Sequence, residues 1–468
     1  ACSQTNFSAS CQQKQQKKDE EKKQKMTKPY LTAPLNEATL PKGIPYIIGN
    51  EAAERFSFYG MRAILVIFMT QYLVNAEGQA DYMSEDEAKG WFHLFVSAVY
   101  MTPLLGALIS DGVLGKYRTI ITLSLVYTLG HFALSLDDTR AGLAIGLGLI
   151  ALGAGGIKPC VSAHLGDQFS KTSSHLLPRA FGWFYFSINL GAFSSTLLIP
   201  WLLERYGSNV AFGVPGILML LATIIFWSGR YRFVHIPAGG KHFILEAFSQ
   251  DGIRAIAQLS VLYLFVAVFW ALFDQTASSW VLQAEKMDRH IFGIELLSSQ
   301  LQAANPLLVM LLIPLFTYVI YPAINHVFPL SPLRKISIGM FVTVLAFTVS
   351  AVIQQQIDAG YSPHISWQIL AYLILTSAEV MISITCLEFS YMQAPAKMKS
   401  FIMAFFMMSI AIGNLFTSAV NFFIDNDDGS SKLAGADYFW FFTLLMLFTA
   451  FLFIFVARGY KEKAHLQS

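Results

Sequence analysis

Apolar residues in this chain gather into about twelve long segments, each of the length that crosses a bilayer as a helix. No segment alternates apolar and polar residues as a strand would. Backbone groups in lipid must be hydrogen-bonded internally, so these segments are expected to be helices. The pattern predicts an all-α polytopic membrane protein with spans at about 44–74, 90–113, 117–136, 141–165, 180–203, 209–228, 256–284, 301–327, 333–353, 367–392, 399–424 and 438–458.

The polar segments define the expected domain boundaries. Residues 1–43 are rich in Gln and Lys, lack an apolar core like that of a signal peptide, and are expected to be a disordered tail. The longest basic connection, from Gly229 to Arg254, divides the spans into six and six. We therefore expect a first six-helix bundle, a cytoplasmic linker, a second bundle and a cytoplasmic tail at 44–228, 229–255, 256–458 and 459–468.

Composition supports this class. Of 468 residues, 54% are hydrophobic and only 13% are charged, which excludes a soluble enzyme of this size. The net charge of +2 comes without a basic domain, so nucleic acid is not an expected partner. Two of the four cysteines lie in the polar tail and two in apolar segments, which does not indicate a disulfide framework.

Basic residues predict the orientation. Alternate loops and the C-terminus hold fifteen Lys and Arg residues, whereas the other loops hold six. The positive-inside rule then places both termini in the cytoplasm and requires an even number of spans. We expect a multi-pass protein of the bacterial inner (plasma) membrane, with the lipid bilayer as its surroundings.

The first apolar segment carries an unusual set of charges. Read as a helix, Glu51, Glu54, Arg55, Phe58 and Arg62 share one face that is about 16 Å long. Charges in hydrocarbon are costly, so such a face is expected to line water or to meet opposite charges. The alternative is a pair of charges at a helix end that reaches the membrane surface.

Other apolar segments also contain polar residues, and each has a structural alternative. The amides and hydroxyls could be hydrogen bonds that pack helices, and His93 could be a core residue or a proton carrier. Lys158, Asp274 and Glu379 could form ion pairs with a structural role only. The residues of interest are His93, Tyr100, Lys158, Asn189, Asp274, Gln275, Asn305, Glu379 and Ser383.

Two bundles of six helices around a central site are the layout of rocker-type transporters. The loop between the second and third segments, Asp111 to Arg118, resembles the DxxxGxxR loop of the major facilitator superfamily. Acids without a nucleophile or a metal-ligand cluster make a membrane-embedded hydrolase the weaker alternative. No metal and no cofactor are expected.

Several motifs resemble those of one family in that superfamily, the proton-dependent oligopeptide transporter family. Residues 51–59, EAAERFSFY, are similar to its ExxERFxYY signature. The further matches occur in order along the chain: Gly153–Pro159, Asp167–Phe169, Phe184–Gly191, Phe269-Trp270 with Asp274-Gln275, Asn305-Pro306, and Glu379 with Tyr391, Gln393, Ala394 and Pro395.

The resemblance implies substrate-binding positions. Arg55 and Lys158 match positions for the peptide carboxylate, whereas Asn305 and Glu379 match positions near the peptide amine. The full set of implied substrate-binding residues is Arg55, Tyr59, Tyr100, Lys158, Asn189, Asn305, Glu379 and Ser383.

The resemblance also implies a proton-coupling set and a gate. Asp274 matches an acid that pairs with Arg62 and Lys158 to close the outside. The implied proton-coupling residues are Glu51, Glu54, Arg55, His93, Lys158 and Asp274, and the implied gate residues are Arg62, Lys158 and Asp274.

This chain departs from the family pattern at two positions. Phe58 replaces the first tyrosine of the signature, and Phe406 stands where many members carry a tryptophan. Both changes predict a pocket with fewer hydrogen bonds. The short connection between the sixth and seventh segments also predicts twelve spans rather than fourteen.

A short peptide is a zwitterion, so its site must offer a cationic and an anionic pole about 7 Å apart. Arg55 with Lys158, and Glu379 in the other half, have the required charges. We therefore predict proton-coupled symport of di- and tripeptides by alternating access, without enzymatic activity. The alternative is a nitrate or other organic-anion carrier of the same family, which would need the cationic pole but not Glu379.

Overall fold

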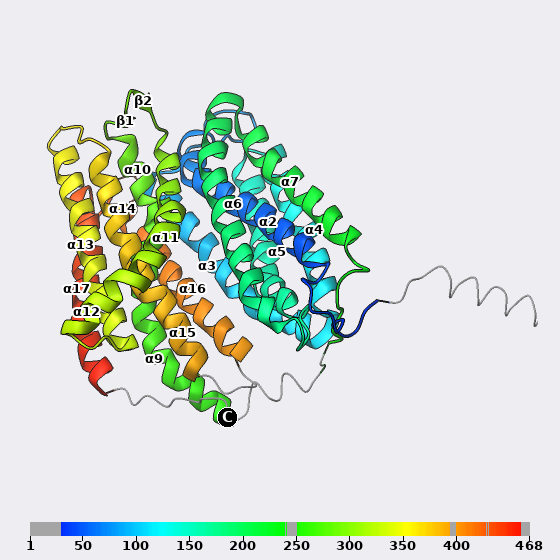
Figure 1. Ribbon diagram of the computed structural model, residues 1–468. Coiled ribbons are helices and arrows are strands. Elements are labelled where there is room, and N and C mark those ends of the chain that lie inside the picture. The colour runs from blue at the N-terminus through cyan, green and yellow to red at the C-terminus, as the bar shows by residue number, and fades with distance from the viewer. Residues whose placement is uncertain are drawn as a thin grey trace, which may run out of the picture.

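The structure is a computed structural model, and it describes residues 30–238, 240, 250–393, 399–426, 428 and 430–459. It is almost wholly helical, which confirms the predicted all-α class (Figure 1). The helices of the first half are α2 (Ile44–Gln71), α3 (Glu85–Ile109), η1 (Ser110–Leu114), α4 (Lys116–Leu136), α5 (Arg140–Gly166), η2 (Ser174–Leu176), α6 (Leu177–Tyr206) and α7 (Ser208–Ser228).

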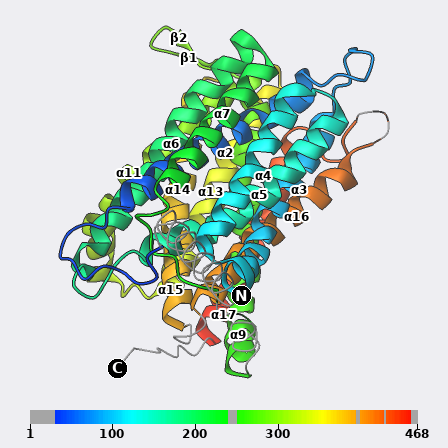
Figure 2. The same cartoon turned by 90° about the vertical axis from the view of Figure 1, so that its right-hand side faces the viewer.

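The second half is built in the same way, with more interruptions. A short antiparallel hairpin lies at one end of the molecule, and the first turns of α9 lie toward the opposite end (Figures 1 and 2). Its elements are α9 (Gln250–Phe273), η3 (Asp274–Ala277), α10 (Ser279–Glu285), β1 (His290–Ile291), β2 (Ile294–Glu295), η4 (Ser298–Ala303), α11 (Ala304–Leu315), η5 (Phe316–Ile320), α12 (Tyr321–Val327), α13 (Pro332–Asp358), α14 (Ser366–Glu379), η6 (Val380–Ile384), α15 (Thr385–Gln393), α16 (Lys399–Ile424) and α17 (Ala436–Gly459).

Eleven helical stretches in the described part of the chain are long and apolar enough to cross a membrane. The helix α2 has the required length as well, but its central turns carry Glu51, Glu54, Arg55 and Arg62. With α2 the spans in the described part of the chain number twelve, in agreement with the prediction. The chain is an integral, multi-pass membrane protein.

Each half of the chain builds an apolar core. One cluster of buried side chains lies mainly in α2 to α7, and another lies in α9 to α17. Tyr100 of α3 packs against both clusters. The exact boundaries of the two bundles, the linker at 229–255 and the orientation of the termini remain predictions, because parts of these segments lie outside the described residues.

The last residues of the predicted N-terminal tail have a defined packing. Leu31 forms a parallel bridge with Val234, which follows the last helix of the first half. The rings of Tyr30 and His235 stack with their centroids 4.2 Å apart. Residues 30–43 therefore pack against the segment that follows α7, while residues 1–29 lie outside the described part.

Helix α5 is built for close packing, as its glycines predict. A Cβ atom placed on Gly153 would lie 2.7 Å from the backbone nitrogen of Tyr127 in α4, so only glycine allows this approach. Pro159 lies inside α5, which continues as a helix through Lys158 and Pro159.

Irregular helix geometry occurs in both halves, and in the second half it coincides with two acids. α9 ends at Phe273, and a 3₁₀ turn begins at Asp274. α14 ends at Glu379, and a π-helical turn follows over Val380–Ile384. Both acids thus lie where the regular hydrogen-bond ladder changes, a feature that is common at functional sites.

Candidate functional site

The charged face of α2 forms a compact cluster of ion pairs. Arg55 donates from Nε to Glu51 Oε1 at 2.7 Å, and the same nitrogen lies 3.2 Å from Glu54 Oε2. Glu51 and Glu54 are each only 1% exposed. Two buried carboxylates therefore share one guanidinium, which leaves the local charge unbalanced by one unit.

Lys158 of α5 extends toward the same region but has no carboxylate partner there. Its ammonium group lies 3.8 Å from the centroid of the Phe58 ring and 4.9 Å from that of Tyr100. The residue is 7% exposed, and Nζ has no hydrogen-bond partner among the described residues. Aromatic faces attract a cation, so they partly replace the water that burial removed.

We call Glu51, Glu54, Arg55 and Lys158 the α2–α5 cluster. Hydrogen bonding in it is incomplete, because the carboxylate oxygens of Glu54 also lack a well-aligned partner among the described residues. Unsatisfied buried charges cost stability, so each one in a native structure calls for an explanation such as a functional role. The cluster is therefore suited to bind a charged group or a proton.

A second group of polar residues connects the two halves. Arg62 of α2 forms an ion pair with Asp274, where η3 begins. The second oxygen of Asp274 accepts a hydrogen bond at 2.6 Å from Asn414 of α16. His93 lies 2.7 Å from the Asn414 oxygen through Nδ1 and 2.9 Å from Ser278 Oγ through Nε2.

We call Arg62, Asp274, Asn414, His93 and Ser278 the interhalf network. It joins α2 and α3 of the first half to η3, α16 and the residue before α10 in the second. Lys158 was expected in this gate, but here Asp274 is bound by Arg62 and Asn414. The assignment of Lys158 to the gate stays a prediction.

Further contacts join the halves near the hairpin end of the molecule. Lys286 donates to Glu85 at 2.8 Å, and Ser84 donates to Asp425 at 2.9 Å. These bonds and the interhalf network hold the two halves together at the end that the positive-inside count predicts to be outside.

Glu379 is held by an amide in the second half. Asn305 Nδ2 donates to Glu379 Oε2 at 2.7 Å and lies 3.2 Å from Thr376 Oγ1. An amide donor orients the carboxylate without neutralising it, so Glu379 keeps an acceptor for a cationic group.

Tyr59 follows Arg55 by one helical turn on α2 and is half-buried. Its hydroxyl lies within the electrostatic reach of Arg55 and Arg62 in the first half and of Glu379 in the second. Tyr100 likewise lies within the electrostatic reach of Arg55, Arg62 and Asp274.

Of the remaining predicted residues, Asn189 and Gln275 form hydrogen bonds within one helical turn. Asn189 Nδ2 donates to the carbonyl of Tyr185 in its own helix at 2.9 Å. Gln275 donates to the carbonyl of Ala271 at 2.9 Å, again within one helical turn. Ser383 lies in the π-helical turn η6, half-buried. The two hydrogen bonds are typical of helix packing.

The sequence analysis missed Asn414 and Ser278. Asn414 is fully buried beside Gly413 in an apolar helix, and a polar residue at such a position is a recognisable signal. It also treated Phe58 only as a lost hydroxyl, whereas the structure places its ring against Lys158. No group of His, Cys, Asp and Glu residues that could hold a metal occurs within the described ranges.

Comparison with known proteins gives consistent results. The family model of the POT family matches residues 117–250 and 240–441. Peptide transporter family 1 of Drosophila melanogaster is 39% identical over 366 residues, which are 68% of this chain and 48% of that protein. Solute carrier family 15 member 2 of Homo sapiens is 36% identical over 397 residues, 74% of this chain and 53% of that protein.

The chain thus spans about half the length of the curated relatives it matches. The crystal structure of the POT family transporter PepTSo aligns with a TM-score of 0.81 and 37% identity, and the match covers 90% of this chain and 98% of that chain. The family-model match begins in α4 and ends in α17, so it includes parts of both halves of the fold. The chain belongs to the POT family, a family of membrane transporters.

Proposed function

We propose that this chain is a proton-coupled symporter of di- and tripeptides that works by alternating access. The observation that carries the proposal is a buried lysine without an acidic partner next to a shared arginine, with an amide-held carboxylate in the opposite half. Relatives that are named as peptide transporters support it.

The two poles match the charges of a peptide. In this proposal the substrate carboxylate binds Lys158 and Arg55, and the substrate ammonium binds Glu379 beside Asn305. Tyr59, Tyr100, Asn189 and Ser383 line the space between. The substrate then bridges both halves, so its binding favours the approach of one half to the other.

Proton coupling follows from competition for Arg55. When the substrate carboxylate takes part of the guanidinium, Glu54 loses the cation that stabilises its charge. An uncompensated buried carboxylate is costly, so Glu54 takes up a proton. Glu51, which keeps the better hydrogen bond to Arg55, holds the arginine in place.

The interhalf network is proposed as the gate. Arg62 and Asp274 close the hairpin end, with Lys158 as a further partner once its charge is free of substrate. His93 is proposed to pass a proton change to the gate, because it reaches Asp274 through Asn414. Opening requires that the contacts crossing between the halves break together, namely the Arg62 to Asp274 pair and the bonds of His93 to Asn414 and Ser278.

The chain is proposed to move its substrate through a lipid bilayer without converting it. The expected bacterial inner membrane stays a prediction, and the relatives from Drosophila melanogaster and Homo sapiens weigh against restricting it to bacteria.

The test is uptake of a labelled dipeptide into proteoliposomes with an imposed pH and voltage gradient. We expect accumulation against the concentration gradient that a protonophore abolishes. Peptide inside the vesicles should be recovered intact, whereas hydrolysis products would indicate an enzyme. Accumulation of nitrate or an organic anion, with no effect of dipeptide, would instead support the anion carrier.

A further inference from the structure

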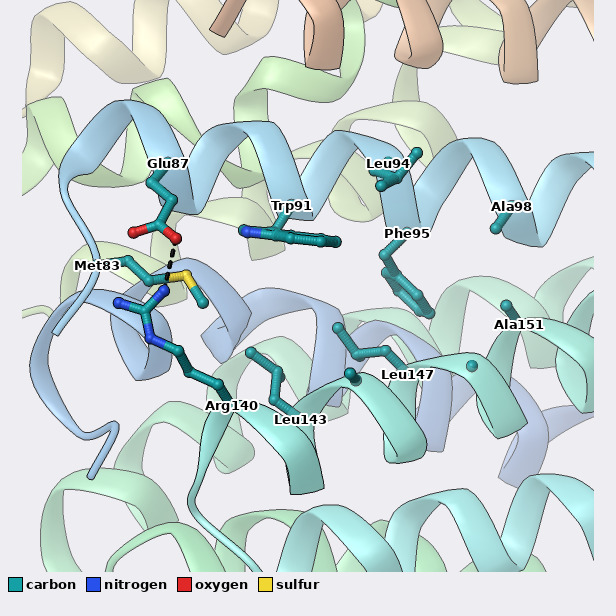
Figure 3. Close-up of a pocket in the computed structure, with 12 residues that line it drawn as sticks. Met83, Glu87, Trp91, Leu94, Phe95, Ala98, Arg140, Leu143, Leu147 and Ala151 are labelled. Carbon is teal, nitrogen blue, oxygen red and sulfur yellow. Dashed lines mark hydrogen bonds and ion pairs between the residues drawn. The ribbon is translucent and has the colours of Figure 1, made fainter. Parts of the chain in front are cut away.

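A groove outside the α2–α5 cluster and the interhalf network runs between α3 and α5. It encloses about 290 Å³ and is lined mainly by apolar side chains (Figure 3). Trp91, Leu94 and Phe95 form the α3 wall, and Leu143 and Leu147 form the α5 wall. The ion pair between Arg140 and Glu87 lies at one end of this groove (Figure 3).

The way these two helices pack explains why the groove exists. Near their other ends they are in backbone contact, because a Cβ atom on Gly106 would clash with the backbone of Gly156. One turn higher, Thr102 Oγ1 donates to the carbonyl of Ala151 at 2.8 Å. Between that bond and the Arg140 to Glu87 ion pair, the small residue Gly148 leaves the space open, with no atom of a neighbouring helix within 4 Å of a Cβ placed there.

The groove has the depth of one bilayer leaflet. From Arg140 to Ala151, α5 rises by about 16 Å, at 1.5 Å for each residue. Half of the hydrocarbon thickness is about 15 Å. Trp91 is 43% exposed and Gly148 is also exposed, so the groove is open on the side that faces lipid.

The charged end of the groove contains both a basic and acidic side chains. Arg140 donates from Nε to Asp81 at 2.8 Å and from Nη1 to Glu87 at 2.5 Å. These three side chains carry a net charge of one negative unit, which disfavours an anionic lipid. A zwitterionic headgroup suits them better, because its phosphate can meet Arg140 and its ammonium can meet a carboxylate.

We propose that this groove binds an acyl chain of a zwitterionic phospholipid, with the headgroup at Arg140, Asp81 and Glu87. The lipid comes from the leaflet at the Arg140 end, which the basic residues predict to be the outer one. The site is separate from the proposed peptide site and does not depend on which solute is carried. It sits on α3 and α5, which also present Tyr100 and Lys158 to that site.

The test uses tryptophan quenching in bilayers. The full chain is reconstituted with phosphatidylethanolamine that carries bromine on its acyl chains, mixed in increasing fraction with unbrominated lipid. The signal of Trp91 is obtained as the difference between wild type and Trp91→Phe. The same difference for Trp201→Phe is the control, because Trp201 is 45% exposed and does not line the groove.

We expect the Trp91 signal to be quenched at a several-fold lower fraction of brominated lipid than the Trp201 signal. Gly148→Leu, which fills the groove without a neighbour to displace, should remove that difference. Gly182→Leu is the matched control, since Gly182 is also an exposed helical glycine with open space around its Cβ position, and it should retain the difference.

Three results would overturn the proposal. The first is equal quenching of Trp91 and Trp201, and the second is a Trp91 signal that Gly148→Leu leaves unchanged. The third is stronger quenching by a brominated anionic lipid or sterol than by the zwitterionic lipid. Circular dichroism and thermal unfolding of each variant show that the fold is intact, so that a lost signal reports the groove itself.

Discussion

The α2–α5 cluster and the interhalf network are both buried and charged, yet their hydrogen bonding differs. In the network, both oxygens of Asp274 and both ring nitrogens of His93 have partners. In the cluster, Glu54 and Lys158 have charged atoms without a hydrogen bond among the described residues. In the network only Arg62 Nε lacks a hydrogen bond among the described residues, whereas in the cluster the charged atoms of both Glu54 and Lys158 lack one.

This difference in hydrogen bonding indicates that the cluster and the network have different functions. A nearly saturated set of polar groups that links two halves stabilises one arrangement of those halves. An unsaturated set costs stability in the empty protein, and this cost is recovered when a ligand of the right charge binds. The cluster is therefore the better candidate for substrate and proton, and the network is the better candidate for the gate.

The sharpest test of the comparison is Glu54→Gln. A neutral amide cannot carry a proton, so we expect accumulation driven by the pH gradient to fall at least about tenfold. Exchange of peptide at equal pH should persist in part, because the amide leaves the pocket similar in shape. Glu388→Gln, at an exposed position in α15, is the control. Normal concentrative uptake by Glu54→Gln would break the comparison.

The second test concerns Glu379. A dipeptide with an acetylated amine should bind the wild-type protein more weakly by about 2–5 kcal/mol, because Glu379 loses its cationic partner. Glu379→Gln should weaken binding of the free peptide and reduce this discrimination. Competition assays with both ligands on both proteins measure it. If the mutation lowers the affinity for both ligands equally, Glu379 only pairs within the protein.

The third test addresses the network. Asp274→Asn should shift the population away from the closed hairpin end, by a free energy of about 1–3 kcal/mol. Spin-label distances between the hairpin-end segments of the two halves report the shift. Asn414→Ala should shift the same distances less, since it leaves the Arg62 ion pair in place. Distances that stay constant across a range of pH in Asp274→Asn would argue against a gate.

The smallest expected effect belongs to Phe58→Leu. Loss of the ring removes the cation–π contact of Lys158, which is worth about 0.5–2 kcal/mol. We expect a modest change in peptide affinity with proton coupling retained, measured as dipeptide competition and pH-driven uptake. Phe58→Tyr keeps the aromatic face and serves as the control. A complete loss of uptake in both variants would mean that Phe58 has a packing role instead.

Sequence alone determined the class of this protein and the residues of interest. The apolar segments, the charged face of the first span and the order of the motifs predicted a twelve-span transporter and placed Arg55, Lys158, Asp274 and Glu379 among the candidates. Length and hydrophobicity suffice for this, because a bilayer leaves the backbone almost no alternative to the helix.

Only the tertiary structure decided which of these residues meet. Whether Asp274 binds Lys158 or Arg62 depends on how α2, α5 and η3 are packed, and the structure has it bound to Arg62 and Asn414. The role of Phe58 as a neighbour of Lys158, and the groove between α3 and α5, likewise depend on helix crossing. Helix packing determines which residues far apart in the sequence come into contact. A pattern of residue types along the chain does not specify that packing.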